Sequence, residues 1–324
     1  MTRWILIFIL GLAGFRPALA RDILIARRSH DIVEQFADSL QKKLSKNYSL
    51  SQFIYEQDNS KAEQELYESI LKEKPKAMLL LDNKAVSMAK HLYDSHPELM
   101  QTPSVATLGL NLKNLIDSQK YPMAGVAYEV SGFSLVTQYR YLFEQPVDNV
   151  LVLYRSKNSL QSLIEDARKQ LERERISLIA VDIDKLSSAG TDLTDVISSQ
   201  LKEDHQGKAI QAVWVFSDNG LLKPEFFKQA WELKAQKLPI PFLCTIEELL
   251  KQFQFCTFAV YPNHEDLAVQ TSDMLRSILE DGIKPSELGV EYVISNKTAI
   301  KQGLMDQLHL RPIAERLNQT QVFP

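Results

Sequence analysis

Short apolar runs alternate along most of the chain with longer stretches in which apolar residues recur every three to four positions. The short runs are typical of buried β-strands and the longer stretches of amphipathic helices. We expect strands at residues 23–26, 51–55, 77–81, 104–107 and 124–128, and a second set at 149–154, 177–181, 212–216, 240–244 and 257–261. Helices are expected at residues 31–44, 61–74, 159–174 and 224–235. This alternation predicts parallel βαβ units with right-handed crossovers.

The two sets of strands share sequence features as well as periodicity. The first strand of each set ends in Arg-Ser, the third ends in Asp-Asn, and the fifth ends in Tyr. The matched residues are Arg28 with Arg155, Asp82 with Asp218, and Tyr128 with Tyr261. The offsets are similar but unequal, which is expected if two lobes share one topology and differ in loop length. The fold class is therefore predicted to be α/β, with two doubly wound parallel-sheet lobes that face each other.

Polar residues at the strand ends are the candidate ligand-binding residues, because an open parallel sheet binds its ligand outside the carboxyl ends of the strands. A cleft between two lobes is also a preferred place for a small-molecule site. The candidates are Arg28, Ser29, His30, Asp82, Asn83, Gly109, Tyr128, Glu129, Arg155, Ser156, Asp218, Asn219 and Tyr261. Arginine matches a carboxylate with two parallel hydrogen bonds, and aspartate pairs with an ammonium group. This mixture suits a small ligand that carries both charges.

Each candidate also has a purely structural interpretation. The two arginines would be solvated residues at strand ends. Asp82 and Asp218 would cap the helices that follow them, since aspartate is a strong N-cap. Tyr128 and Tyr261 would pack as aromatic residues at the hinge between the lobes.

The N-terminal residues match a secretory signal peptide. Arg3 precedes an apolar run of about 12 residues, and Ala18-Leu19-Ala20 supplies the small residues of a cleavage site before Arg21. The run is shorter than the roughly 20 residues that span a bilayer. No cysteine follows the cleavage site to carry a lipid. We expect residues 1–20 to be removed and the protein to be free in the periplasm.

Composition excludes several classes of function. The chain has 324 residues, 45% of them hydrophobic, and a formal net charge of -4. That balance provides no basic surface for nucleic acid. Nucleotide-binding glycine loops and zinc-binding histidine motifs are absent from the sequence, and residues 132–136 lack the final glycine of a nucleophile elbow. We therefore expect no cofactor, no metal and no catalytic residues.

Cys244 and Cys256 are the two cysteines of the chain, and export to an oxidising compartment would favour a disulfide between them. Cys244 closes one expected strand, whereas Cys256 opens the next apolar run, residues 255–261. Parallel neighbours would hold the two residues at opposite edges of the sheet, and a disulfide needs Cα atoms within about 7 Å. We expect two buried thiols.

The second half of the chain resembles the ABC transporter substrate-binding proteins of the tryptophan/tyrosine-type family, which have the type 1 periplasmic-binding-protein fold. The matching stretches are VLVLYRSKN at 150–158, AVWVFSDN at 212–219, LPIPF at 238–242, SDMLRSIL at 272–279 and YVISNKTA at 292–299. They cover most of residues 150–310 in order. Asp218 and Asn219 fall on the family's threonine-aspartate-asparagine stretch, which implies ligand contacts.

The resemblance implies a hinge of three segments, near residues 128–132, 261–265 and 288–293. Lobe 1 would then comprise residues 21–130 plus about 263–290, and lobe 2 residues 131–262 plus about 291–324. The helix expected at 265–281 would pack on lobe 1, and residues 296–305 on lobe 2. The first half departs from the family, since Asp82-Asn83 replaces a glycine-threonine turn and residues 108–111 replace an aspartate-proline. The fold is therefore implied more strongly than the ligand.

The function that the resemblance implies is a monomeric periplasmic binding protein that closes on a small ligand, such as an amino acid, and delivers it to an inner-membrane ABC permease. One alternative is a ligand sensor of the same fold that signals to a membrane kinase or cyclase. A periplasmic enzyme and a scaffold with an empty cleft are further alternatives.

Overall fold

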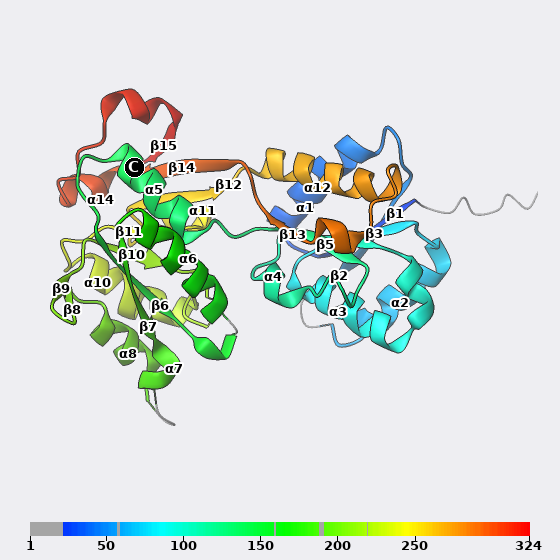
Figure 1. The fold of residues 1–324 in the computed structure, drawn as a ribbon, viewed down its shortest axis with the longest axis horizontal. Helices are drawn as coiled ribbons and strands as arrows, with labels where there is room; N and C mark the ends of the chain where they lie inside the picture. The colour runs from blue at the N-terminus through cyan, green and yellow to red at the C-terminus, as the bar shows by residue number, and fades with distance from the viewer. Residues whose placement is uncertain (1–21, 57–58, 159, 188–190, 219) are drawn as a thin grey trace, which may run out of the picture.

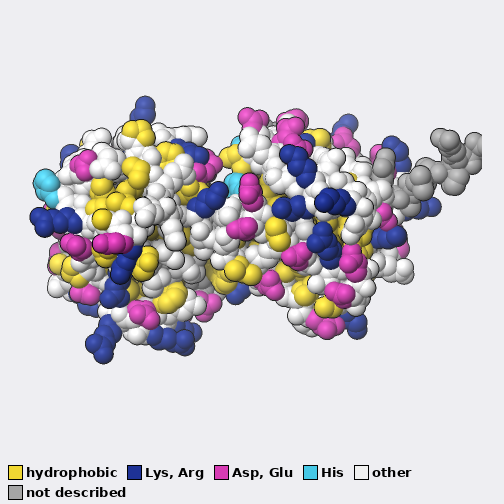
Figure 2. Space-filling model, turned by 90° about the horizontal axis from the view of Figure 1, so that it is seen from above, with side chains coloured by type: hydrophobic (Ala, Val, Ile, Leu, Met, Phe, Trp, Pro, Cys, Tyr) yellow, Lys and Arg dark blue, Asp and Glu magenta, His cyan; other side chains and the backbone are white. Residues whose placement is uncertain are grey.

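The computed structural model describes residues 22–56, 59–158, 160–187, 191–218 and 220–324. The expected signal peptide and Asn219 lie outside these residues. The described chain forms two α/β lobes side by side along the long axis of the molecule (Figure 1). Seen from above, the lobes meet at a narrower waist, and acidic and basic side chains are interspersed on both (Figure 2). The two-lobed α/β fold predicted from the sequence is confirmed.

Lobe 1 contains a six-stranded sheet in which every pair of neighbours is parallel, in the order β13-β5-β4-β3-β1-β2. The strands are β1 (Ile23–Arg28), β2 (Leu50–Tyr55), β3 (Ala77–Leu81), β4 (Ser104–Ala106), β5 (Met123–Ala127) and β13 (Val290–Tyr292). All five residues of β3 and of β5 are buried, as expected for parallel strands covered on both faces.

Helices cover both faces of this sheet. On one face, α1 (Asp31–Leu44) and α12 (His264–Leu279) lie side by side (Figure 1). On the other face lie α2 (Ala62–Glu73), α3 (Asn83–Ser95) and the short α4 (Leu112–Leu115). Helix α1 buries Val33, Phe36, Ala37, Leu40 and Leu44, whose spacing places them on one side of a helix. The 3₁₀ turn Pro97–Gln101 precedes β4, and α13 (Pro285–Leu288) precedes β13.

Lobe 2 contains a seven-stranded sheet in the order β15-β14-β12-β11-β10-β6-β7. Its strands are β6 (Asn149–Tyr154), β7 (Ser177–Asp182), β10 (Ala212–Val215), β11 (Phe242–Cys244), β12 (Phe258–Pro262), β14 (Asn296–Lys301) and β15 (Thr320–Phe323). Only the β12–β14 pair is antiparallel among the described ladders of this sheet. A separate hairpin joins β8 (Asp204–His205) to β9 (Lys208–Ala209).

Helices α5 (Gly132–Leu142) and α6 (Gln161–Arg173) cover one face of the second sheet. The other face is covered by α8 (Leu193–Gln200), α11 (Glu247–Gln252) and a helical segment made of α9 (Pro224–Phe226), a π-helical stretch (Phe227–Glu232) and α10 (Leu233–Ala235). Shorter elements are α7 (Ile183–Leu186), α14 (Gln302–Gln307) and the 3₁₀ segments Ser156–Asn158 and Ala314–Gln319. No helix in the described parts of the chain is long and apolar enough to cross a membrane.

Three connections join the lobes, namely β5 to α5, β12 to α12 and β13 to β14. The ten strands expected from the apolar runs all form, with ends within two residues of the expected ones. Residues 296–305 pack on lobe 2, but they begin with strand β14 rather than with a helix. Strands β13, β14 and β15 and the two short strands of the β8–β9 hairpin were not predicted.

The expectation for the cysteines is wrong. Cys244 and Cys256 form a disulfide, with their Cα atoms 5.9 Å apart. Strand β12 begins at Phe258, so Cys256 lies in the preceding loop and not on the strand. The backbone N–H of Thr257 donates to the carbonyl of Phe242 at 2.8 Å, which brings this loop back against β11. The assumption that Cys256 extends a parallel strand was therefore the error.

Candidate functional site

The carboxyl ends of β1 and β3 place Arg28, Asp82 and Asn83 around one pocket of lobe 1. The pocket has a volume of about 340 Å³. Tyr55, Lys84, Leu108 and Leu110 complete its lining. The sequence rule for open parallel sheets therefore located a real concavity.

Asp82 organises this pocket. Its Oδ1 accepts hydrogen bonds from the Tyr55 hydroxyl at 2.6 Å and from the backbone N–H of Ala85 at 2.8 Å. Its Oδ2 lies 3.8 Å from Nε of Arg28. The Ala85 bond caps helix α3, as the structural interpretation of Asp82 expected. Burial raises the pKa of Tyr55, and the Asp82 carboxylate raises it further, so the phenol remains a donor.

Asn83 and Gly109 shape the wall of the same pocket. The Asn83 side-chain amide donates to the Leu110 carbonyl at 2.9 Å. A Cβ on Gly109 would lie 2.6 Å from Asn83 Oδ1 and 2.5 Å from the Leu112 side chain. Only glycine therefore allows this loop to approach Asn83 so closely. Ser29 and His30 are exposed and lead into α1, so they border the pocket next to Arg28 without lining it.

The carboxyl ends of the lobe 2 strands hold a second polar cluster. The Arg155 guanidinium contacts Oδ1 of Asp184 through both Nε and Nη2, each at 2.9 Å. Burial alone would raise the pKa of Asp184, but the backbone N–H of Lys157 and the Arg155 guanidinium hold it below its usual value. The Ser156 N–H donates to Oδ1 of Asp182 at 3.2 Å.

Asp218 is buried within this cluster, at 1% exposure. Its carboxylate accepts the backbone N–H of Arg155 at 2.9 Å and that of Gly220 at 2.8 Å. It therefore fixes the loop after β10 rather than capping a helix. Next to it, the hydroxyls of Ser217 and Thr245 are 2.7 Å apart.

Asp184 and Thr245 are polar residues that the sequence reasoning missed. Asp184 follows the carboxyl end of β7, and Thr245 follows that of β11. Both could have been found by applying the strand-end rule to every strand, not only to the strands with matched motifs.

Tyr128 and Tyr261 pack inside the protein. The Tyr128 hydroxyl lies 2.7 Å from Nε2 of His264, which joins the first connection between the lobes to the start of α12. Burial raises the pKa of Tyr128 and lowers that of His264, so both groups are held neutral. Tyr261 is 4% exposed and donates to the Gln321 side chain at 3.0 Å. These contacts favour the hinge and core interpretation of both tyrosines.

Glu129 lies in a cavity at the hinge, which we call the hinge cavity. Its volume is about 80 Å³, and residues of both lobes line it. The lining comprises Lys113, Glu129, Val130, Ser131, Gly132, Leu163, Asp166, Ala167, Gln170, Trp214, Phe216 and Tyr292. Oε1 of Glu129 accepts the backbone N–H of Asn111. Burial raises the pKa of Glu129 to about 7.

Nearby, the Asn114 side chain donates to the Ser162 hydroxyl at 2.9 Å, which joins α4 to α6 across the lobes.

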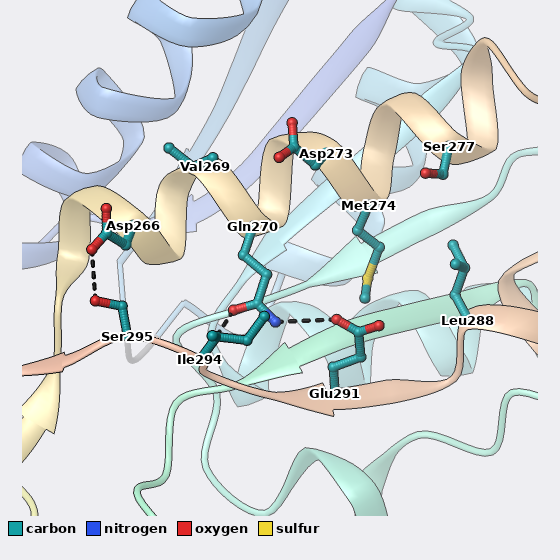
Figure 3. Close-up of a pocket in the computed structure, with 10 residues that line it drawn as sticks. All are labelled: Asp266, Val269, Gln270, Asp273, Met274, Ser277, Leu288, Glu291, Ile294 and Ser295. Atoms are coloured by element: carbon teal, nitrogen blue, oxygen red, sulfur yellow. Dashed lines mark hydrogen bonds between the residues drawn. The ribbon is translucent and has the colours of Figure 1, made fainter.

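A further hollow of about 500 Å³ lies between α12 and the third connection (Figure 3). Gln270 bridges this hollow, because its amide donates to Glu291 at 3.1 Å and accepts the Ile294 N–H at 3.2 Å. The Ser295 hydroxyl donates to Asp266 at 2.6 Å (Figure 3). These bonds brace the third connection against α12.

The structure groups most candidates by lobe. Arg28, Asp82 and Asn83 share the lobe 1 pocket, and Arg155, Ser156 and Asp218 share the lobe 2 cluster. None of the cavities described above is lined by both Arg28 and Asp218. A ligand that touches both residues would therefore require the lobes to approach each other.

Solved structures with the same architecture cover nearly the whole chain. One is a ligand-free, open substrate-binding protein with adhesive properties from Clostridium difficile, at a TM-score of 0.66 and 13% identity, covering 93% of this chain and 99% of that one. Another is an ABC domain in complex with L-Trp from Streptococcus pneumoniae, at 0.60 and 16%, covering 93% and 100%. A third is an ABC transporter substrate-binding protein in complex with Leu from Desulfitobacterium hafniense, at 0.51 and 10%, covering 88% of each chain.

The sequence matches no family model and no curated protein. The fold is nevertheless defined by the two doubly wound sheets, their three connections and these structures. The chain has the type 1 periplasmic-binding-protein fold, as the resemblance implied.

Proposed function

We propose that this protein is an exported solute-binding protein that closes its two lobes on a small ligand and delivers it to an ABC transporter permease. The observation that carries the proposal is the matched pair of polar clusters at the carboxyl ends of the two sheets, around Arg28 and Asp82 in lobe 1 and around Arg155 and Asp218 in lobe 2. Two such clusters on lobes joined at a hinge suit a ligand held between them.

Closure would follow from population shift. A ligand that contacts both clusters only when the lobes approach binds the closed state more tightly, and this difference in affinity drives the closure. The side-chain hydrogen bond from Asn114 to Ser162 is one contact between the lobes that such a motion would change.

An amino acid is the ligand class that we propose. The Arg28 guanidinium lies at the edge of the lobe 1 pocket, where it can pair with a carboxylate. The Asp82 carboxylate in the same pocket can pair with an ammonium group. Leu108 and Leu110 add apolar surface for a side chain.

Export through cleavage before Arg21 is part of the proposal, and it rests on the sequence of residues 1–20. Expression of the full chain in a Gram-negative cell, followed by N-terminal sequencing of the periplasmic fraction, tests it. A mature protein beginning at Arg21 is expected. Retention of Met1 in the cytoplasm would contradict it.

A thermal-shift screen with amino acids, nucleosides and small organic acids tests the binding function. A ligand present at 100 times its Kd raises the free energy of unfolding by about 2.7 kcal/mol, so a binder stands out clearly. Mass spectrometry of the recovered compound should show it unchanged, whereas an enzyme would release a product. Absence of any stabilising compound would contradict the proposal.

A further inference from the structure

Two residues that line the hinge cavity each carry a buried polar atom that has no hydrogen-bond partner among the residues the structure describes. These atoms are Nε1 of Trp214 and Oε2 of Glu129. Trp214 is 2% exposed. A buried donor or acceptor without a partner costs about 1–3 kcal/mol, so such groups in folded proteins usually meet water or a ligand.

Trp231 shows that a buried indole in the same lobe can be satisfied by the protein itself. It is 1% exposed, and its Nε1 donates to the Leu221 carbonyl at 3.1 Å. Trp214 has nearly the same degree of burial without such an acceptor in the described parts of the chain. The difference points to a role for the Trp214 N–H that the fold does not explain.

The indole of Trp214 is held firmly in the hinge cavity. A Cβ on Gly132 would lie 2.4 Å from its ring, so the first connection between the lobes packs directly on it. The ring of Phe216 stands perpendicular to it, with centroids 5.0 Å apart. Lobe 1 supplies Tyr292 on the other side of the hinge, where Lys113 Nζ lies 4.1 Å from the centroid of the Tyr292 ring. The cavity therefore has aromatic walls from both lobes.

The chemistry of the two atoms restricts the occupant. An indole N–H only donates, so the occupant must offer an acceptor. Because Oε1 of Glu129 already accepts from Asn111, Oε2 is the oxygen left to meet the occupant. Burial raises the pKa of this carboxyl to about 7, so Oε2 either donates or accepts near neutral pH. An ammonium group cannot accept from Trp214. A carboxylate fits only while Glu129 is protonated, because the ionised form would repel it, whereas an uncharged acceptor fits both forms.

We propose that the hinge cavity is a ligand subsite for an uncharged hydroxyl or carboxamide group, which accepts a hydrogen bond from Nε1 of Trp214 and bonds with Oε2 of Glu129. This inference rests on the proposed binding function and specifies its ligand: the transported compound carries a neutral polar group. The cavity volume of about 80 Å³ suits such a group rather than a whole ligand. Residues of both lobes line the cavity, so its occupant would also favour one angle between the lobes.

Matched compounds test the subsite. The pairs are L-tyrosine with L-phenylalanine, L-serine with L-alanine, and L-glutamine with L-glutamate, each titrated calorimetrically into the wild-type protein. Within a pair that binds, we expect the hydroxyl or carboxamide member to bind about tenfold more tightly, because only that member supplies partners to the buried polar atoms. Trp214→Phe should abolish this preference. Trp231→Phe is the matched control and should retain it.

Stability of the ligand-free protein provides a second measurement that needs no ligand. Trp231→Phe breaks an existing hydrogen bond, whereas Trp214→Phe removes an N–H that has none, so we expect the Tm to fall further in Trp231→Phe. An equal or larger fall in Trp214→Phe would show that the N–H is already bonded, for example to an ordered water, and would overturn the proposal.

The outcomes separate the two proposals. Binding of both members of each pair with equal affinity, or a preference that survives in Trp214→Phe, overturns the subsite and leaves the binding function intact. Failure of every compound to bind, in these pairs and in the wider screen, overturns the binding function and the subsite with it.

Discussion

The Tyr55 hydroxyl donates a 2.6 Å hydrogen bond to Oδ1 of Asp82, the residue that follows β3. Asp218 is its counterpart in the repeated sequence of lobe 2, and it binds the backbone N–H of Arg155 instead. The repeat therefore conserves position while the contacts differ. Arg28 lines a pocket beside Asp82, whereas the Arg155 guanidinium is hydrogen-bonded to Asp184.

Because Asp184 already pairs with Arg155, we expect Arg28 to be the arginine that contributes more to ligand binding. Arg28→Ala should weaken binding of the ligand found in the screen by roughly tenfold or more, the loss expected for one charge-assisted hydrogen bond. Arg28→Lys keeps the charge but not the fork, so an intermediate loss is expected. Isothermal titration calorimetry measures both. Unchanged affinity in Arg28→Ala would remove the lobe 1 pocket from the binding site.

Asp218→Ala should lower stability as well as affinity. It strands the backbone N–H groups of Arg155 and Gly220, and each that remains buried costs about 1–3 kcal/mol. Asp218→Asn keeps one acceptor oxygen, so a smaller loss in the free energy of unfolding is expected. Urea denaturation compares the two variants with the wild type. Equal stability of all three would show that the carboxylate does not hold the loop after β10.

Gly132 should tolerate no side chain. A Cβ there would lie 2.4 Å from the Trp214 ring, which Phe216 and the sheet prevent from moving aside. Overpacking of this kind costs about 1–3 kcal/mol. Gly303 in α14 is the matched control, because nothing lies within 4 Å of a Cβ at that position. Differential scanning calorimetry should give a lower Tm for Gly132→Ala and an equal or higher Tm for Gly303→Ala. A wild-type Tm in Gly132→Ala would contradict the rigid packing of the hinge cavity.

The buried central strands could be predicted because hydrophobic runs reflect burial on both faces of a parallel sheet. Strand β3 is an uninterrupted apolar segment, and its predicted bounds match the observed ones. Strands β13, β14 and β15 lacked such a signal. Strand β14 has the sequence NKTAIK and is exposed at its start, so its partner β12 determines it more than its own residues do.

The candidate site could be predicted where strands end, and this rule also selected Glu129 at the hinge, but it did not select Trp214. Arg28 and Asp82 were found because the carboxyl end of each strand is visible in the sequence. Tyr261 also ends an expected strand, but its side chain packs in the core with residues of α8 and α11. The role proposed for Trp214 depends on its place in the lining of the hinge cavity and on the absence of an acceptor among its described neighbours, which are properties of packing alone.

Glu129 should make stability depend on pH. Its folded pKa of about 7 lies above the ordinary value, so between the two values the folded protein retains a proton that the unfolded chain has released. Stability from this group is therefore present at low pH and decreases as the pH rises towards 7. Lys113, Asp166 and Tyr292 face the same cavity, and Arg173 and Glu174 line the adjoining hollow.

Urea denaturation at pH 5 and pH 7.5 measures the effect. The fall in the free energy of unfolding between these conditions should be smaller in Glu129→Gln than in the wild type, because glutamine does not ionise. The neighbouring His264 has a lowered pKa and acts with the opposite sign, so comparison with the variant isolates Glu129. An identical pH dependence in both proteins would contradict a protonated Glu129.

The Cys244–Cys256 disulfide should contribute measurably to the stability of lobe 2. It closes a loop with a sequence separation of 12 residues, and a loop of about 15 residues corresponds to roughly 3 kcal/mol. The double variant Cys244→Ala/Cys256→Ala should therefore unfold at a lower urea concentration than the oxidised wild type.

Both cysteines are 0% exposed, so a reductant should act on the wild type only once unfolding begins. Wild-type protein reduced in urea and then refolded is the chemical control, and it should match the double variant. If the double variant and the oxidised wild type had the same midpoint, the loop before β12 would be held by its packing and by the Thr257 to Phe242 bond rather than by the disulfide.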